Sequence, residues 1–271
     1  MSDLALHSLA EFAPLILPCL DHVDAKRFGE ISLERGSLSK ILAERCTQRG
    51  GKLIYIDPEP GGEFDLWAQG HSRVTKIAQH SLEALKDCDH ADAWFVDGDH
   101  NYYTVYHELK LIDRLQRAAR EPLLAFVHDV SWPCGRRDFY ADPTRIPRGW
   151  RHPHSFEHGV LLGEEAAMRG RGFRGPSNCA VALEAGGPRN GVLSAVEDFL
   201  KEAHTAKRPL LFVHVPAFLG LGVVYDASAE WSDKLTQFLL PYHANPLIAR
   251  IEENRLRNYL EVIDWQDKMA S

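Results

Sequence analysis

Two short segments of the sequence each end an apolar run with acidic and imidazole side chains. The first segment, Ala93 to His100, carries Asp97. The second, Leu123 to Val130, carries His128 and Asp129. Apolar runs of this length are typical of buried parallel strands, and open α/β sheets bind their ligands at the carboxyl ends of such strands. We therefore expect these side chains to converge on one cleft.

Carboxylates and imidazoles at one cleft suit metal binding or proton transfer. Two carboxylates with an imidazole or water match the preference of Mg²⁺ or Mn²⁺, so the cluster could hold such an ion. His128, His100 and Asp97 are the predicted catalytic residues, with either histidine as the base. Because side chains alternate along a strand, His128 and Asp129 can both reach the cleft only if the strand ends between them.

Each of these residues also has a structural explanation. Asp99 could cap a helix that begins near Tyr102, and either histidine could bond only to a backbone carbonyl. Acids that close two buried strands are costly without partners, which favours a functional role for Asp97 and Asp129.

The elements that must position these residues alternate along the first half of the chain. Strands are predicted at Arg27–Leu33, Lys52–Asp57, Val74–Gln79, Ala93–Asp97 and Leu123–Val130, and helices at Leu38–Gln48, Glu63–Ala68, Leu82–Lys86 and Tyr102–Arg117. Such alternation implies right-handed crossovers and a mostly parallel sheet covered on both faces. Two later strands, Pro209–Pro216 and Gly222–Asp226, follow each other closely enough to pair antiparallel.

We therefore predict a Rossmann-like, doubly wound α/β fold with a mostly parallel seven-stranded sheet and a C-terminal antiparallel hairpin. The expected parts are an N-terminal helical extension at 1–25, a main domain at 26–226 and a C-terminal helical extension at 227–271. Residues 131–190 are rich in Pro, Gly, Arg, His and Trp and should form a long loop insertion that acts as a substrate lid. The apolar stripes of the terminal helices predict a homodimer surface.

Composition excludes several classes of function. The chain has 271 residues, 45% of them hydrophobic, which is enough for one large core. Its 31 basic and 38 acidic residues give a net charge of −7, which argues against nucleic-acid binding through bulk charge. The five scattered cysteines are expected to be free thiols in the cytoplasm. Charged residues interrupt the opening stretch, so we expect neither a signal peptide nor a membrane span.

The first predicted strand leads into a polar turn that contains glycine and then into a helix. Ligands of nucleotide type lie on such turns, because the backbone can approach closely and the helix start offers free N–H groups. The G-x-G-x-x-G spacing of a pyrophosphate site is absent, which favours a cofactor without phosphates. The second strand ends at Asp57, where an acid can accept hydrogen bonds from a ribose, although an acid before Pro58 is also a common turn former.

The sequence resembles the class I S-adenosylmethionine-dependent methyltransferases. The matching parts are Gly29–Ser37, Asp57, Phe95–His100 and Val127–Val130. The similarity is greatest to small-molecule and sugar O-methyltransferases, some of which depend on a metal, as catechol O-methyltransferase does. By analogy with these, the resemblance implies Asp97 and Asp129 as metal ligands, with His128 as the third ligand or the general base. The resemblance implies a cofactor site formed by Glu30, Ser32, Gly36, Ser37, Asp57, Ser81 and Asp97. By this analogy Glu30 and the turn hold the methionine part, Asp57 binds the ribose and Ser81 borders the adenine.

The sequence thus predicts a methyltransferase that moves a methyl group from S-adenosylmethionine to a hydroxyl of a small molecule of sugar or natural-product type. A divalent metal, a histidine base or both would remove the hydroxyl proton. Two alternatives stay open: a metal-dependent hydroxylase or hydrolase on the same fold, and a noncatalytic cofactor-binding scaffold. A small-molecule substrate is expected as partner, without nucleic acid or membrane.

Overall fold

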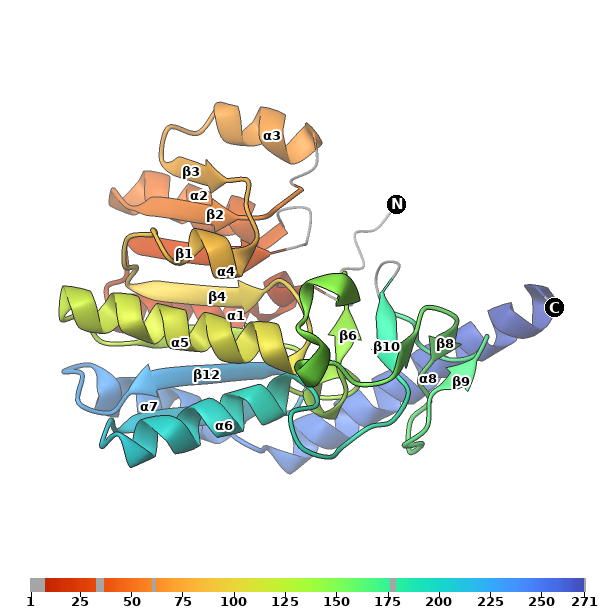
Figure 1. Cartoon of the computed structure of the whole chain (residues 1–271). Helices are drawn as coiled ribbons and strands as arrows, with labels where there is room; N and C mark the ends of the chain where they lie inside the picture. Colours follow the sequence, from red (N-terminus) through yellow and green to blue (C-terminus); the bar gives the residue numbers. More distant parts are fainter. Residues whose placement is uncertain (1–7, 33–36, 60–61, 176–178, 271) are drawn as a thin grey trace.

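The computed structural model describes residues 8–32, 37–59, 62–175 and 179–270. The main sheet has seven strands: β1 (Arg27–Ser32), β2 (Lys52–Ile56), β3 (Val74–Ile77), β4 (Ala93–Asp97), β5 (Leu124–His128), β11 (Leu210–Val215) and β12 (Leu221–Asp226). Their order is β11-β12-β5-β4-β1-β2-β3 (Figure 1). Strand β12 runs opposite to the other six strands, so it pairs antiparallel with both β11 and β5, and the remaining pairs are parallel. The predicted Rossmann-like fold with an antiparallel C-terminal hairpin is confirmed.

Helices cover both faces of this sheet (Figure 1). One core lies beneath α4 (Ser81–Ala84), α5 (Tyr102–Ala119) and α6 (Val192–Thr205), and a second lies beneath α1 (Ala13–His22), α2 (Ser37–Arg49) and α7 (Ser232–Leu239). Alternation along the strands assigns side chains to these cores. On β4, Trp94 belongs to the first core and Phe95 to the second, and on β5 Phe126 shares the second core with Phe95.

A glycine in β1 makes room for the largest buried side chain. A Cβ atom at Gly29 would lie 2.3 Å from the ring of Trp94 on the neighbouring strand β4. The indole of Trp94 is fully buried and donates to Oε1 of Gln116 on α5 at 3.2 Å. Glycine within a strand commonly marks such a close approach, and here it allows α5 to be anchored against β4.

The start of α5 corrects one expectation. Asn101, rather than Asp99, is the N-cap, and its side chain accepts a hydrogen bond from the backbone N–H of Thr104 at 2.9 Å. Asp99 holds this cap in place, because its carboxylate accepts hydrogen bonds from the side-chain amide of Asn101 and from the hydroxyl of Thr104. Both residue types are common at helix starts, so the sequence could not choose between them.

The insertion at 131–190 is more ordered than the loop that we expected. Its described part contains η2 (Cys134–Arg136), β6 (Phe139–Tyr140), η3 (Pro143–Arg145), η4 (Arg148–Trp150), β7 (His154–Ser155), β8 (His158–Gly159), β9 (Met168–Arg169) and β10 (Ala180–Ala182). Strands β6, β10 and β7 form a small sheet, and β8 pairs with β9. Strands of two or three residues produce no recognisable periodicity, which explains why the sequence did not reveal them.

One buried carboxylate ties this insertion to the main domain. Oδ1 of Asp138 accepts hydrogen bonds from the backbone N–H groups of Tyr102 and Gly191, both at 2.7 Å. Tyr102 begins α5 and Gly191 caps α6. The backbone N–H of Asp138 donates to Oδ1 of Asn190 at 2.8 Å. The beginning and the end of the insertion are therefore held together at the starts of two sheet-covering helices.

The chain ends pack differently from each other. After η1 (Leu9–Phe12), helix α1 packs its buried apolar side chains into the second core of the same chain. These side chains are therefore not exposed for contact with a partner. The C-terminal extension is divided near Pro241 and Pro246 into α7, η5 (Leu240–Tyr242) and α8 (Pro246–Ala270). The remaining helix, α3 (Gly62–Gln69), lies near β3 at one edge of the sheet (Figure 1). In the described part of the chain, no helix is long and apolar enough to cross a membrane.

Candidate active site

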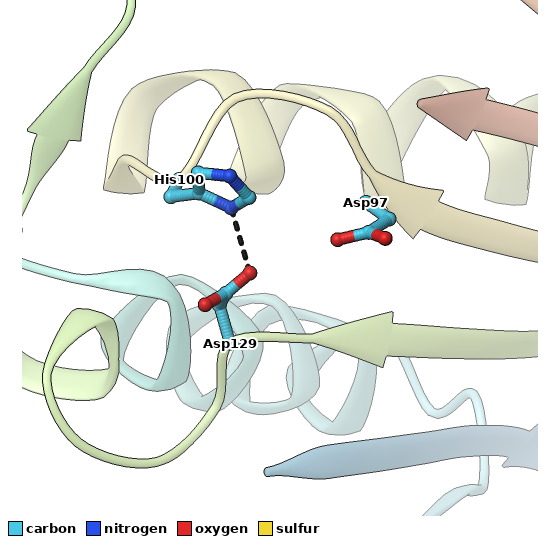
Figure 2. A group of neighbouring side chains, drawn as sticks. All are labelled: Asp97, His100 and Asp129. Carbon is cyan, nitrogen blue, oxygen red and sulfur yellow. Dashed lines mark ion pairs between the residues drawn. The ribbon is translucent and has the colours of Figure 1, made fainter. Parts of the chain in front are cut away.

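Two acids and two imidazoles alternate at the carboxyl ends of β4 and β5. Nδ1 of His100 lies 2.7 Å from Oδ2 of Asp129, a pair that Figure 2 marks with a dashed line. Nδ1 of His128 lies 2.8 Å from Oδ1 of Asp97 and 3.3 Å from the same Oδ2 of Asp129. Asp97, His128 and Asp129 are buried, whereas the side chain of His100 is 18% exposed. The convergence expected from the two strand ends is therefore present.

The local backbone explains how consecutive residues reach one site. Strand β5 ends at His128, and Asp129 follows with φ +64°. This left-handed conformation costs most residues free energy, but aspartate tolerates it better than most. The turn redirects the side chain of Asp129, so that it meets the imidazole of its own neighbour. The strand thus ends between the two residues, as side-chain alternation requires.

The carboxylates keep both imidazoles charged. Burial by itself lowers the pKa of a histidine, yet the Asp129 carboxylate raises the pKa of His100 to about 10. Burial lowers the pKa of His128 too, but the carboxylates of Asp97 and Asp129 outweigh it and raise this pKa to about 9. Burial opposes ionisation of Asp129 as well, but the two imidazoles hold its pKa well below the usual range. Near neutral pH neither imidazole can accept a proton until the charge around it changes.

The donor set fits a hard divalent cation. One potential ligand atom from each of Asp97, His100 and Asp129 lies within 4.8 Å of the others (Figure 2). Two carboxylates and one imidazole match the ligands of Mg²⁺ or Mn²⁺. This group contains His100, whereas the sequence suggested His128. The loop between β4 and α5 decides the difference, because it brings His100 back over the end of β5, and no sequence periodicity describes that loop.

A cavity of about 510 Å³ opens beside this cluster at the same edge of the sheet. Its lining includes Ser32 at the end of β1, Pro58 after β2, Ser81 at the start of α4 and Gly98 after β4. Residues 141, 142, 145 and 146 of the insertion form another wall. A volume of this size is typical of a small-molecule site, and its position is where open α/β sheets bind ligands.

Asp57 lies at the β2 side of this cavity, between lining residues Ile56 and Pro58. The hydroxyl of Tyr55 donates to its Oδ2 at 2.9 Å, and the backbone N–H of Glu59 donates to its Oδ1 at 2.8 Å. The second contact is the turn-forming role considered from the sequence. Each carboxylate oxygen can accept a further hydrogen bond, so the two contacts orient Asp57 without exhausting its capacity for a ligand.

The other predicted cofactor residues are distributed as follows. Glu30 is buried within β1, on the same side of the strand as Ser32. Ser32 lies opposite Asp97 in the register of β1 and β4. Ser37 is the exposed first residue of α2, and Gly36 lies outside the described residues. The structure therefore brings Ser32 and Ser81 to the cavity and places Asp57 and Asp97 next to it.

One contact at this cavity could not be expected from the sequence. Arg145 of the insertion and Glu83 of α4 form an ion pair at 2.8 Å, and both residues line the cavity. Their side chains join the insertion to the main domain beside Ser81. An arginine among many in an irregular stretch carries no sequence signal for such a pairing, which depends on how the insertion folds back.

Comparisons with known proteins give only distant likenesses. No family model matches the chain, and no curated protein matches it. The chain is similar to a 1,6-didemethyltoxoflavin N1-methyltransferase from Burkholderia thailandensis with bound S-adenosylhomocysteine (15% identity, 83% of this chain and 80% of that chain covered, TM-score 0.47). It is also similar to the methyltransferase PaMTH1 of Podospora anserina (16%, 79% and 76%, TM-score 0.44). Because these TM-scores are below 0.5, we derive the function from the residues of the chain itself.

Proposed function

We propose that the protein is a methyltransferase that transfers the methyl group of S-adenosylmethionine to a hydroxyl of a small molecule. The observation that carries this proposal is the cavity between the ends of β1, β2 and β4. Asp57 lies on its β2 side, and the cluster of Asp97 and Asp129 lies beside it at the ends of β4 and β5. A nucleoside held by an acid at the end of β2 suits this place in an open α/β sheet. The absence of a pyrophosphate-binding glycine motif favours a cofactor without phosphates.

In this proposal the chain mainly positions the reactants. Asp57 accepts hydrogen bonds from the ribose hydroxyls of the cofactor, and Ser81 borders its adenine. Glu30 and Ser32 lie toward its methionine part. Methyl transfer requires the oxygen, the carbon and the sulfur to lie in line, so most of the catalytic effect comes from orientation. The insertion wall at 141–146 contacts the same cavity and limits what can enter.

The hydroxyl must also lose its proton. Asp97, Asp129 and His100 have the donor atoms to hold a divalent cation, which when bound would lower the pKa of a coordinated hydroxyl. Nδ1 of His128 forms a hydrogen bond with Asp97 and lies within ion-pair distance of Asp129, so the imidazole helps to hold both acids in place. Binding of a cation would also replace the positive charge that the imidazoles now supply, leaving a histidine free to take the proton.

Calorimetric titration with S-adenosylhomocysteine tests the cofactor assignment. We expect wild-type protein to bind and Asp57→Asn to bind about 100-fold more weakly, because two hydrogen bonds to a charged acceptor are weakened. Asp89→Asn is the control, since Asp89 is exposed in the segment that enters β4 at the opposite edge of the sheet. A wild-type protein that binds Mn²⁺ but not S-adenosylhomocysteine would contradict the proposal and favour a hydroxylase or hydrolase.

A further inference from the structure

Helix α8 carries a continuous exposed stripe along one face. We define the α8 stripe as Leu247, Ile251, Asn254, Asn258, Val262, Trp265 and Met269, all of which are exposed. Successive members are four, three, four, four, three and four residues apart, which keeps them on one face of a helix. Its five apolar members are between 53% and 72% exposed. Apolar side chains this exposed on one face indicate a surface that binds something.

The opposite face of α8 is already fixed to the body of the protein. Leu256 is buried, and Tyr259, Leu260 and Ile263 pack against the same core. Ion pairs reinforce this attachment, including one of 2.6 Å between Arg171 and Asp264. Figure 1 shows α8 running past the insertion and extending beyond it. The stripe therefore points away from the body, on a helix whose orientation is set.

The spacing of the stripe is symmetric about Asn258. Reading outward from this residue, the intervals are four, three and four in both directions. An antiparallel copy of the same helix, related by a two-fold axis at Asn258, would place Ile251 opposite Trp265 and Leu247 opposite Met269. We propose that the partner of the α8 stripe is the α8 stripe of a second copy of this chain, bound antiparallel in this register. Self-complementarity of this kind is the defining property of a two-fold interface.

The residue on the proposed axis supports this register. An asparagine amide has both a donor and an acceptor group, so two copies of Asn258 that face each other can satisfy one another. A buried asparagine pair of this kind commonly fixes the register of paired helices at some cost in stability. In this register Asn254 lies opposite Val262 at the edge of the asparagine pair. Moving the axis to midway between Asn254 and Asn258 would pair these two asparagines, but it would set Ile251 against Glu261 and Val262 against Arg250. The register centred on Asn258 therefore keeps more apolar contacts.

The available area is sufficient for a dimer. The five apolar residues expose roughly 600 Å² per copy, so a symmetric pair that covered them completely would bury about 1,200 Å², to which contacts of the flanking residues would add. This is the lower end for stable interfaces. Attachment to a lipid surface is less favoured, because Asn254 and Asn258 interrupt the apolar stripe at its centre. The nearby charges are also mixed, with Glu261 among Arg250, Arg257 and Lys268.

Single cysteine substitutions test the register. We expect Asn258→Cys to form a disulfide-linked dimer on mild oxidation, because the two thiols would face each other across the axis. Leu247→Cys alone should remain monomeric on a non-reducing gel, and a mixture with Met269→Cys should cross-link. Wild-type protein with its own cysteines measures the background. Efficient self-linkage of Leu247→Cys would overturn the antiparallel register.

Light scattering tests the dimer itself. At micromolar concentration we expect twice the chain mass for wild type. In Trp265→Glu the dissociation constant of the dimer should rise at least about 100-fold, because a tryptophan buried in an interface commonly dominates its binding energy. Leu66→Glu, at a residue 73% exposed on α3, is the matched control and should stay dimeric. A monomeric wild type would overturn the proposal. So would a monomer that binds phosphatidylcholine–phosphatidylserine vesicles through Trp265, which would assign the stripe to a membrane surface.

Discussion

Asp129→Asn should weaken Mn²⁺ binding at least about 100-fold and leave the affinity for S-adenosylhomocysteine nearly unchanged. The carboxylate of Asp129 is the member of the cluster that contacts both imidazoles. Asparagine has nearly the same size and also tolerates the left-handed backbone at φ +64°. The substitution therefore removes a negative charge without disturbing the turn, and titration calorimetry with each ligand measures the result.

The separation of the two ligands makes this experiment informative. Asp89→Asn again serves as the control and should bind both ligands as wild type does, because its carboxylate is exposed away from the cluster. If Asp129→Asn bound Mn²⁺ as tightly as wild type, the ion would not be held by this cluster, and a metal-free mechanism with a histidine base would replace the metal mechanism. If it lost both ligands and also melted early, repeating the measurement with His100→Gln, which removes a ligand atom that has no part in the proposed cofactor site, would separate unfolding from lost ligation.

Glu108→Gln should stabilise the protein increasingly as the pH rises. Glu108 lies on α5 and is fully buried, and neither of its carboxyl oxygens has a hydrogen-bond partner among the described residues. Burial raises its pKa to about 8 in the folded state. The unfolded chain loses this proton near pH 4.5, so between about pH 4.5 and 8 the folded state binds more protons and stability falls as the pH rises. Below this window the residue contributes no penalty.

Glutamine removes that penalty because it cannot ionise. The free energy of unfolding of Glu108→Gln should exceed that of wild type by an amount that grows across this window, to on the order of 4 kcal/mol above pH 8. Urea unfolding at pH 5, 7 and 8.5 measures the difference. Glu121→Gln, at an exposed position after the same helix, should give the same difference at all three values. A constant difference for Glu108→Gln as well would mean that Glu108 is already ionised in the folded protein.

Strands β4 and β5 could be predicted from the sequence because each is a buried apolar run with a clear end. The less apolar strands β1 and β3 follow from the regular alternation of strands and helices along the chain. The same pattern predicted that Asp97 and Asp129 would meet, since β4 and β5 are neighbours with their carboxyl ends together. The sequence could not choose between His100 and His128, because His100 reaches the cluster through a loop. It also missed the small sheets of the insertion, whose strands are too short for a periodic signal.

The hydrogen bonds of Asp138 and Asn190, which hold the two ends of the insertion together, have an evolutionary consequence. Because they join both ends of the intervening stretch, that stretch is a closed loop whose anchor points belong to the sheet-covering helices. The free-energy cost of closing a loop, which comes from lost chain entropy, rises only with the logarithm of its length, by about 0.6 kcal/mol for each doubling. Surface turns within residues 139–189 can thus change in length at little cost, while the side chains that this stretch packs into the main core stay in place. Under the proposed function, such changes would alter which acceptors are admitted without changing the strand ends of the main sheet.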